Sequence, residues 1–284
     1  MSRALSYRTG RANDLEQAYG LSSSLGWPHR PEEWRFAANT GQIVVAEDGT
    51  AIVGTAVFWK FGAGSATVGL VMSSPQYAQC DVERVLMDRI SEETGERSVV
   101  LNAPTDRVEA YMQQEFVLTG SVEQFQGAVH RASEVFPVAG ERLRPLCKSD
   151  LPRLIELASR GSGFDRDGLL PLLLDSSSGI GLERNGALMG FALFRRFGRG
   201  YAIGPVITPV VRSVDNGECL VRYLLRRFEG VLLRIDLPSG SALGAQLLKL
   251  GLQHVDTVHT MVKNRAPRSD GHFQQVALIS HSLC

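Results

Sequence analysis

The sequence predicts an α/β protein built from two tandem copies of one domain, each a mixed, mostly antiparallel twisted sheet flanked by helices. The main observation is an internal repeat. NDLEQAYGLSSSLGW returns as SDLPRLIELASRGSGF, so Asp14 corresponds to Asp150, an offset of 150 − 14 = 136 residues. AIVGTAVFWKFG returns as ALMGFALFRRFG, and Gly54 matches Gly190 at the same offset. A repeat of this length spans a whole domain rather than a short repeat unit.

The segment RASEVFPVAGE separates the two copies. It changes composition and contains Pro137 and Gly140, which are typical of a linker. We therefore expect an N-terminal domain at residues 1–132 and a C-terminal domain at residues 133–284. Each domain is expected to have its own sheet, and one sheet running across the junction would contradict this arrangement.

The expected elements follow the same order in each half. A helix begins near an Asp or Ser at residues 13–24 and 148–160, where apolar residues recur at helical spacing. A short second helix contains PEEWRFAAN or RDGLLPLLLD. Apolar runs broken by Asp-Gly or Asn-Gly predict a hairpin, formed by QIVVAED with AIVGTAVFWKF and by GIGLERN with ALMGFALFRRF. SATVGLVMS and GYAIGPVIT predict the next strand, and a helix, a strand, a helix and one or two strands complete each unit.

Composition argues against several kinds of partner. Thirty Lys and Arg residues balance thirty Asp and Glu residues, so no overall field attracts nucleic acid or an anionic membrane. The N-terminal residues lack the apolar core of a signal peptide, and no apolar run reaches the roughly 18 residues of a membrane span. The four cysteines are scattered, without a Cys-x-x-Cys pair or histidines at metal-ligand spacing. We expect a cytoplasmic protein with reduced, mostly buried thiols and no metal, as a monomer or homodimer.

The order of motifs resembles the GNAT superfamily of N-acetyltransferases. VGLVM leads into a turn and a helix, and LNAPTDRVEAYMQQEF is similar to the L-x-A-T-x-x-G…L-Y-x-x-x-G-F segment of that superfamily. GWPHRPEEW looks like a short signature of its bacterial two-domain members. In the second half, GFDRDGLLPLLL and VALISHSLC are similar to the domain often called YitH-like. The resemblance implies two GNAT-like domains and acetyl-CoA or another acyl-CoA as donor.

The resemblance also places the coenzyme A pyrophosphate at R/Q-x-x-G-x-G/A, where backbone amides at a helix N-terminus hold it. Residues 78–83 of the first half read Ala-Gln-Cys-Asp-Val-Glu, so both glycines are replaced by acids. A carboxylate about 5 Å from a phosphate, at an effective dielectric near 20, opposes it by roughly 3 kcal/mol, about a hundredfold in affinity. The expected donor-binding residues are Leu70, Val71, Met72, Gln79, Cys80, Asp81, Val82, Glu83, Arg84 and Asn102.

The second half offers a rival loop. Residues 212–217 read Arg-Ser-Val-Asp-Asn-Gly, which keeps the leading Arg and the last Gly of the motif. Arg212, Ser213 and Gly217 are therefore second-domain candidates for donor binding. The family precedent favours the first half and the loop chemistry favours the second, so the sequence leaves this choice open.

Two residues are candidates for catalysis. Tyr111 matches the position where the superfamily places a phenol that returns a proton to the departing thiolate; a helix-packing tyrosine is the alternative. His29 lies in WPHR, on the acceptor side in this superfamily, where an imidazole can take a proton from an ammonium group; a structural histidine is the alternative. Trp27, Arg30 and Trp34 are the expected acceptor-binding residues, with Trp34 better suited to the core.

We therefore expect an acyltransferase that moves an acetyl or other acyl group from acyl-CoA to the amine of a small molecule by direct attack. Because both pyrophosphate loops are degenerate, two alternatives stay open. One is a catalytically silent GNAT-fold protein that binds a metabolite or protein partner, and the other takes its acyl group from a carrier protein. Asp165 and Arg166, which follow GSGF, are expected to form an ion pair; a solvated pair is favoured, and a pair at the domain junction or on the cleft edge is the alternative.

Overall fold

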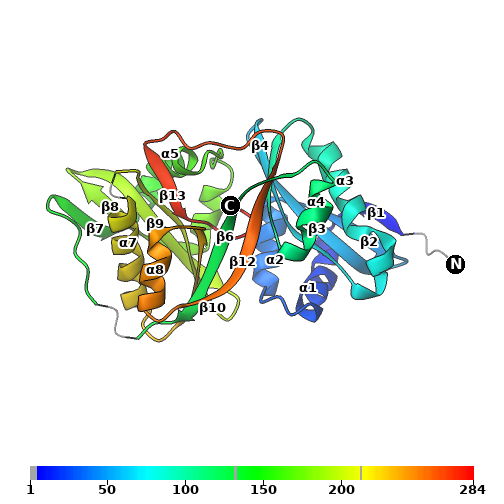
Figure 1. The fold of residues 1–284 in the computed structure, drawn as a ribbon, viewed down its shortest axis with the longest axis horizontal. Helices are drawn as coiled ribbons and strands as arrows, with labels where there is room; N and C mark the ends of the chain where they lie inside the picture. Colours follow the sequence, from blue (N-terminus) through cyan, green and yellow to red (C-terminus); the bar gives the residue numbers. More distant parts are fainter. Residues whose placement is uncertain (1–4, 131–132, 212) are drawn as a thin grey trace.

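The computed structural model describes residues 5–130, 133–211 and 213–284, and shows two copies of one α/β unit side by side (Figure 1). The first unit contains β1 (Ser6–Thr9), α1 (Leu15–Ser24), α2 (Pro31–Thr40), β2 (Gln42–Asp48), β3 (Ala51–Phe61), β4 (Ser65–Ser73), α3 (Val82–Thr94), β5 (Ser98–Ala103), α4 (Val108–Met112) and β6 (Val117–Ala128). The second contains β7 (Glu141–Pro145), α5 (Leu151–Ser162), α6 (Leu170–Asp175), β8 (Ser177–Arg184), β9 (Ala187–Phe197), β10 (Gly200–Pro209), α7 (Ser213–Arg227), β11 (Leu232–Pro238), α8 (Ala242–Lys249) and β12 (Gln253–Lys263). One more strand, β13 (Phe273–Ala277), follows β12.

An ion cluster repeats with the fold. Arg8 donates hydrogen bonds to both oxygens of Asp14, at 2.7 and 3.0 Å, and to Glu47 at 2.8 Å. The second unit repeats this cluster at the same offset with the residues Arg144, Asp150 and Glu183. In both clusters, the hydrogen bonds from the arginine hold the pKa of the Asp well below its usual range. These two arginine clusters each tie the start of a first helix to the first hairpin, and they support the predicted duplication.

The prediction of two separate sheets is wrong. A single sheet has the order β1-β2-β3-β4-β5-β12-β6-β11-β10-β9-β8-β7, with β13 paired to β10. Strand β12 of the second unit lies between β5 and β6, and β6 lies between β12 and β11. Figure 1 shows β6 and β12 running together across the middle of the molecule. Each unit thus places one strand, β6 or β12, among strands of the other unit, and residue 132, where the proposed first domain ends, lies outside the described residues.

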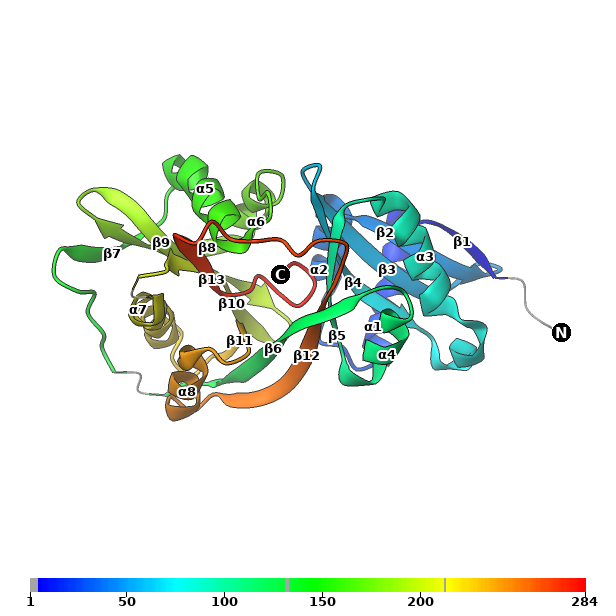
Figure 2. The ribbon, with the colours of Figure 1, turned by 45° about the horizontal axis from the view of Figure 1, so that its top comes forward.

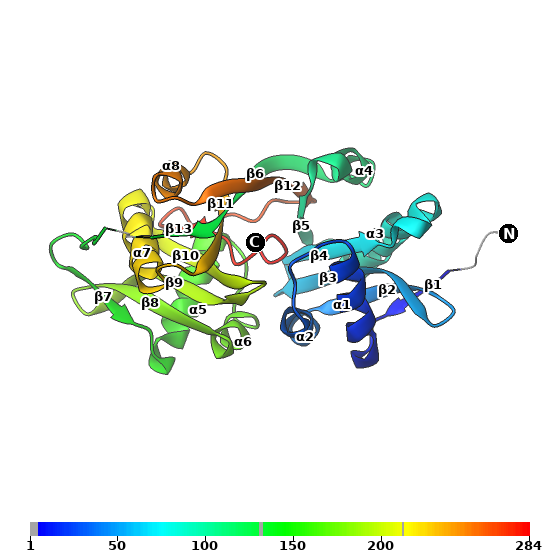
Figure 3. The same ribbon diagram turned by 90° about the horizontal axis from the view of Figure 1, so that it is seen from below.

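The units also share a hydrophobic core. On one side of the sheet, Trp34 of α2 belongs to the same buried cluster as Leu157 of α5, Phe191 of β9 and Leu283. On the opposite face of the first unit, α3 packs its buried side chains against β2, β3 and β4. Figure 3 shows the two units side by side with β6 and β12 bridging them. Because the core and the sheet both cross the junction, the two units are held as one body.

Candidate functional site

The candidate donor site of the first unit is the place where β4 and β5 separate. The strands pair in parallel over Ser65–Val68 and Ser98–Leu101 and diverge after that. Leu70 adopts a left-handed conformation with φ 51°, and the register between β3 and β4 shifts at this point. Thr55 Oγ1 donates a hydrogen bond of 3.0 Å to the Leu70 carbonyl, which fixes the bulge. Residues 70–72 are therefore on a stretch of β4 that is not paired with β5.

The loop after β4 keeps a sharp turn without its glycine. A short 3-10 helix, Pro75–Cys80, leads to Asp81, which has φ 49° and ψ 29°, and α3 begins at Val82. Asp81 stands where the superfamily motif has its first glycine. Aspartate adopts the left-handed conformation more readily than most residues, so the turn survives the replacement. Gln79 and Cys80 are exposed on this loop.

The two acidic residues that replace the glycines, Asp81 and Glu83, differ in exposure and in hydrogen-bond partners. Glu83 Oε1 accepts a hydrogen bond from Ser73 Oγ at 2.9 Å and from Arg107 Nη2 at 3.3 Å. Its carboxylate therefore links the end of β4 to the segment between β5 and α4. Asp81 is exposed and pairs with the exposed Arg84 at 3.4 Å, where solvent weakens the interaction. Glu83 is the stronger competitor for an anion at the start of α3.

Residues 278–284, the terminal segment, cover the separation of β4 and β5 on the side of α1 and α2. A Cβ at Gly69 would collide with Ser282, so the segment lies directly against β4. Asn102 Nδ2 donates a hydrogen bond of 2.8 Å to the carbonyl of His281. Figure 2 shows the terminal segment between the two units. The side chain of Asn102 thus binds the chain itself, and its donor-binding role stays a prediction.

Arg166 holds the end of the terminal segment in place. Its guanidinium donates to the carbonyl of Leu283 at 2.9 Å and to that of Cys284 at 2.7 Å, and it lies 4.9 and 4.7 Å from the centroids of two phenylalanine rings. The residue is 1% exposed, and burial lowers its pKa to about 10. The prediction of a solvated ion pair with Asp165 is wrong. One arginine within GFDRDG gives no sequence signal of this contact, because its partners are main-chain oxygens 117 and 118 positions away.

Tyr111 is buried in the core cluster that contains Val82 and Leu86 of α3. It is 8% exposed and packs against Phe116 with ring centroids 5.9 Å apart. Burial, and then the charge of Glu83, raise the pKa of the phenol above its usual value, so it is protonated at neutral pH. Both interpretations from sequence, packing and proton donation, fit this environment.

His29 faces the second unit rather than Tyr111. Its ring lies 5.6 Å from Trp27 and 5.6 Å from Phe197, which ends β9. Burial, and then the charge of Arg234, lower the pKa of His29 to about 4. Its Nδ1 is buried and has no hydrogen-bond partner among the described residues. The structure therefore places His29 in the junction between the units, away from the predicted phenol.

Arg30 and Trp34 make structural contacts. Arg30 pairs with Glu33 at 2.6 Å and is the N-cap residue of α2. Trp34 is 1% exposed and donates its indole N–H to Ser22 Oγ at 3.1 Å. The ring of Trp34 offers no free face to an acceptor, and its predicted acceptor-binding role is corrected to core packing. Trp27 is partly buried against the same core.

In the second unit, β13 fills the corresponding separation. Strands β10 and β11 pair in parallel over Tyr201–Ile203, and β13 then pairs with β10 over Val206–Pro209. Leu278 N donates a hydrogen bond of 2.9 Å to the carbonyl of Asp236 on β11. A Cβ at Gly204 would collide with the carbonyl of Leu278. The chain's own backbone thus occupies the gap between β10 and β11.

Of the three donor-binding candidates in the second unit, the structure describes the surroundings of Gly217 only. Gly217 is buried in α7, and an added Cβ would come within 3.0 Å of Val276 on β13. This glycine allows the helix to approach β13, and it faces no open cleft. Arg212 lies outside the described residues, and the side chain of Ser213 is not described.

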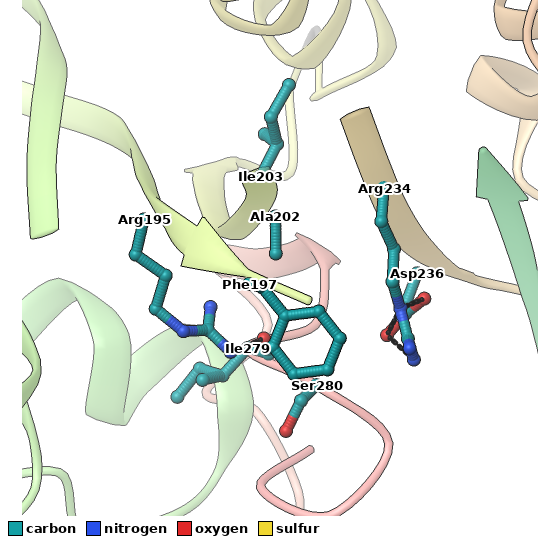
Figure 4. Close-up of a pocket in the computed structure, with 8 residues that line it drawn as sticks. All are labelled: Arg195, Phe197, Ala202, Ile203, Arg234, Asp236, Ile279 and Ser280. Atoms are coloured by element: carbon teal, nitrogen blue, oxygen red, sulfur yellow. Dashed lines mark hydrogen bonds and ion pairs between the residues drawn. The ribbon is translucent and has the colours of Figure 1, made fainter. Parts of the chain in front are cut away.

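A narrow charged pocket lies where β10 and β11 separate (Figure 4). It is lined by Arg195, Phe197, Ala202, Ile203, Arg234, Asp236, Ile279 and Ser280. Arg234 pairs with Asp236 at 2.8 Å, and Arg195 donates a hydrogen bond of 3.0 Å to the carbonyl of Ile279. The pocket has no room for a water molecule, so it is a packed polar contact with the terminal segment.

The described residues contain no group of three or more His, Cys, Asp or Glu side chains arranged to hold a metal ion. None of the helices in that part of the chain is long and apolar enough to cross a membrane. The four cysteines are free thiols, and the prediction that they are buried holds for Cys219 and Cys284 but is wrong for Cys80 and Cys147.

Comparison with known proteins agrees with this geometry. Residues 154–275 match the family model of the acetyltransferase (GNAT) domain. This part of the chain is therefore similar to the GNAT acetyltransferase domain. The match lies in the second unit, and the first unit repeats its element order. The YitH-like subtype stays a prediction, and a comparison with curated protein sequences found no match.

Solved structures share the fold over both units. A candidate acetyltransferase from Pyrococcus horikoshii superposes with a TM-score of 0.77 and 15% identity, covering 100% of this chain and 97% of that chain. A GCN5-related N-acetyltransferase from Sphaerobacter thermophilus gives a TM-score of 0.65 and 14% identity, covering 93% and 96%. A tandem GNAT protein from the clavulanic acid biosynthesis pathway gives 0.63 and 15%, covering 94% and 100%. At these identities the likeness establishes the tandem GNAT fold.

Proposed function

We propose that the first unit transfers an acyl group from acyl-CoA to the amine of a small molecule. GNAT proteins transfer acyl groups, and the similarity to this family supports acyl transfer in general. The proposal adds that the acceptor is the amine of a small molecule. One observation supports the first unit as the site. Strands β4 and β5 separate at the bulge of Leu70, whereas β13 closes the equivalent gap in the second unit.

The residues of the first unit fit an acyl-CoA donor in backbone shape. Residues 70–72 would pair with the amide groups of the pantetheine arm, and the start of α3 after Asp81 would face the pyrophosphate. Arg107 would supply the positive charge that Ala78 cannot. Glu83 is the misfit, because its carboxylate already takes the hydrogen bond of Arg107. Donor binding therefore requires Glu83 to release Arg107.

The bound donor would supply a thioester whose carbonyl carbon is attacked by the amine. The amides of residues 70–72 would polarise that carbonyl, since they lie on the unpaired stretch of β4. As the C–S bond breaks, Tyr111, protonated at neutral pH, would give its proton to the departing thiolate, and the proton released by the attacking nitrogen would pass through water to restore the phenol. The terminal segment covers the face that the amine must approach, so the segment moves aside for transfer.

A second candidate is a catalytically silent GNAT-fold protein that binds a metabolite or protein partner. It is favoured because the chain itself occupies both places where a donor would lie. Strand β13 fills the gap between β10 and β11 in the second unit, and Ser282 lies against Gly69 of β4 in the first. Carrier-protein donation has no supporting contact among the described residues.

Calorimetric titration of the full chain with acetyl-CoA separates the two candidates. Micromolar affinity together with N-acetylated product from a small amine supports acyl transfer. In that case Tyr111→Phe should lower kcat and leave the donor Kd unchanged, because the phenol acts after binding. Absence of binding at near-millimolar acetyl-CoA would favour the silent protein.

A further inference from the structure

A cavity of about 300 Å³ lies between the two units, next to the terminal segment. Its walls come from β5, β6 and β12, from the end of α5, from residues 266–267, and from Gln275, Leu278 and Cys284. The volume is at the lower end of the range for small-molecule pockets, roughly 300–1,000 Å³. Because β12 and α5 belong to the second unit, the cavity exists only in the exchanged arrangement.

The side chains that line this interdomain cavity carry no formal charge, and Arg166, outside the lining, donates to the main-chain oxygen of Cys284 at 2.7 Å. None of its described lining residues is Asp, Glu, Lys, Arg or His. Burial raises the pKa of the Cys284 thiol to about 11, so it is neutral as well. The apolar part of the wall includes Val100, Val122, Phe164 and Val262. A charged ligand would lose its hydration here without gaining an ion pair, which disfavours it strongly.

Most of the polar side chains that line the cavity already have hydrogen-bond partners within the protein. Thr260 Oγ1 donates a hydrogen bond to Asn102 Oδ1 at 2.7 Å, and Thr119 Oγ1 donates to the Thr260 carbonyl at 3.2 Å. Ser121 Oγ bonds to Ser239 Oγ at 2.7 Å. Gln275 Oε1 is different, since it is buried and has no hydrogen-bond partner among the described residues. An acceptor of this kind is costly to leave unpaired, and a ligand N–H would satisfy it.

We propose that this cavity binds the acyl acceptor and selects a neutral, mainly apolar amine of the aromatic-amine type. Its ring contacts the apolar wall, and a polar hydrogen bonds to Gln275 Oε1 once a rotation of that side chain turns the buried oxygen toward the cavity. Amino acids and polyamines are excluded, because the lining has no partner for their charges. This assignment rests on the proposed acyl transfer.

The cavity is next to the separation of β4 and β5. Asn102 lines the cavity and also binds the His281 carbonyl, and the adjoining Ser282 lies against Gly69. A ligand in the cavity is therefore separated from β4 by the terminal segment alone. An apolar site also keeps an amine unprotonated, since burial disfavours the ammonium form, and the unprotonated amine is the nucleophile.

The test uses two isomers that differ in charge, 4-ethylaniline and 2-phenylethylamine. Both contain a benzene ring, two further carbons and one nitrogen, but at neutral pH the first is neutral and the second is a cation. Each is titrated into the full chain without donor, and Kd is measured by ligand-observed NMR. The neutral isomer should bind at least about tenfold more tightly. Equal affinities, tighter binding of the cation, or no binding of 4-ethylaniline at millimolar concentration would overturn the proposal.

Matched variants locate the site. Gly120 lines the cavity and has open space around an added Cβ, so Gly120→Leu should fill it and weaken 4-ethylaniline binding at least about tenfold. Gly64, in the β3–β4 turn, also has open space and lies outside the cavity, so Gly64→Leu should bind like the wild type. If Gly120→Leu unfolds, as judged by circular dichroism, Gln275→Leu removes the unpaired acceptor and should weaken binding several-fold. Unchanged affinity in a folded cavity variant would refute the assignment.

A parallel assay adds acetyl-CoA and measures N-acetyl-4-ethylaniline by chromatography. Donor-free binding that is lost in the cavity variant, without any product, would leave the cavity site standing and contradict acyl transfer. Acetylation of another amine without arylamine binding would contradict the cavity assignment and leave acyl transfer standing. Failure of either proposal is thus recognised separately.

Discussion

Replacement of Arg166 by Met should destabilise the chain by about 3–5 kcal/mol. The guanidinium is 1% exposed and donates to two main-chain oxygens, those of Leu283 and Cys284, at 2.9 and 2.7 Å. Each oxygen left buried without a donor costs about 1–3 kcal/mol. Loss of the two phenylalanine contacts adds about 0.5–2 kcal/mol, and removal of a desolvated charge offsets part of the total.

Urea unfolding followed by tryptophan fluorescence measures this change. Arg166→Lys keeps the charge but lacks the second arm of the guanidinium, so it should lose roughly half as much stability. A loss below about 1 kcal/mol for Arg166→Met would refute the anchoring role.

Thiol labelling supplies a second measurement of the same contact. In a background in which the exposed Cys80 and Cys147 are replaced by Ser, Cys284 is buried and should react slowly with a maleimide. Arg166→Met should speed that reaction at least about tenfold, because the terminal segment opens locally at lower free energy. Cys219, which is 3% exposed and lies on α7 of the second unit, should stay protected and serves as the internal control.

Three further predictions test other contacts. Burial lowers the folded-state pKa of His29 to about 4, below its ordinary 6.5, so the unfolded chain binds the proton first as the pH falls. The free energy of unfolding should therefore fall by on the order of 2–3 kcal/mol between about pH 6.5 and about pH 4, and His29→Phe should flatten this slope. Glu83→Gln should tighten acetyl-CoA binding by about tenfold or more by releasing its arginine partner, whereas Asp81→Asn, at an exposed pair, should change it less than about threefold; the reverse order, measured by calorimetry, would contradict the assigned roles. Asp14→Asn and Asp150→Asn should each lower stability in urea by about 1–3 kcal/mol, and a loss in only one would argue against equivalent arginine clusters.

The local elements could be predicted from the sequence because they depend on local patterns. Asp48-Gly49 marks a hairpin, and the observed strands Gln42–Asp48 and Ala51–Phe61 match the two apolar runs on either side. SATVGLVMS corresponds to β4 without a shift of either boundary. Strands β1 and β7 are missed, because SYRT and ERLRP are short and polar and carry no apolar alternation.

The arrangement between the units could not be predicted. β6 and β12 have the same place in the repeat, and β5 and β11 are equivalent as well. The sequences of β6 and β12 therefore do not indicate that β12 pairs with β5 and β6 with β11. β13 has no counterpart in the first unit, so the repeat gives no warning that it fills the gap between β10 and β11. The loop sequence identifies the acidic replacements, but it does not show that Glu83 turns inward while Asp81 stays exposed. These features depend on contacts between residues far apart in the chain.

Hydrogen–deuterium exchange with and without saturating acetyl-CoA tests the central assignment most directly, since it reports which unit holds the donor. We expect one donor per chain, slower exchange at residues 70–73 and 79–84, and unchanged exchange at residues 204–209 and 213–217. Protection confined to the second-unit residues, or no protection in either unit at near-millimolar acetyl-CoA, would contradict it.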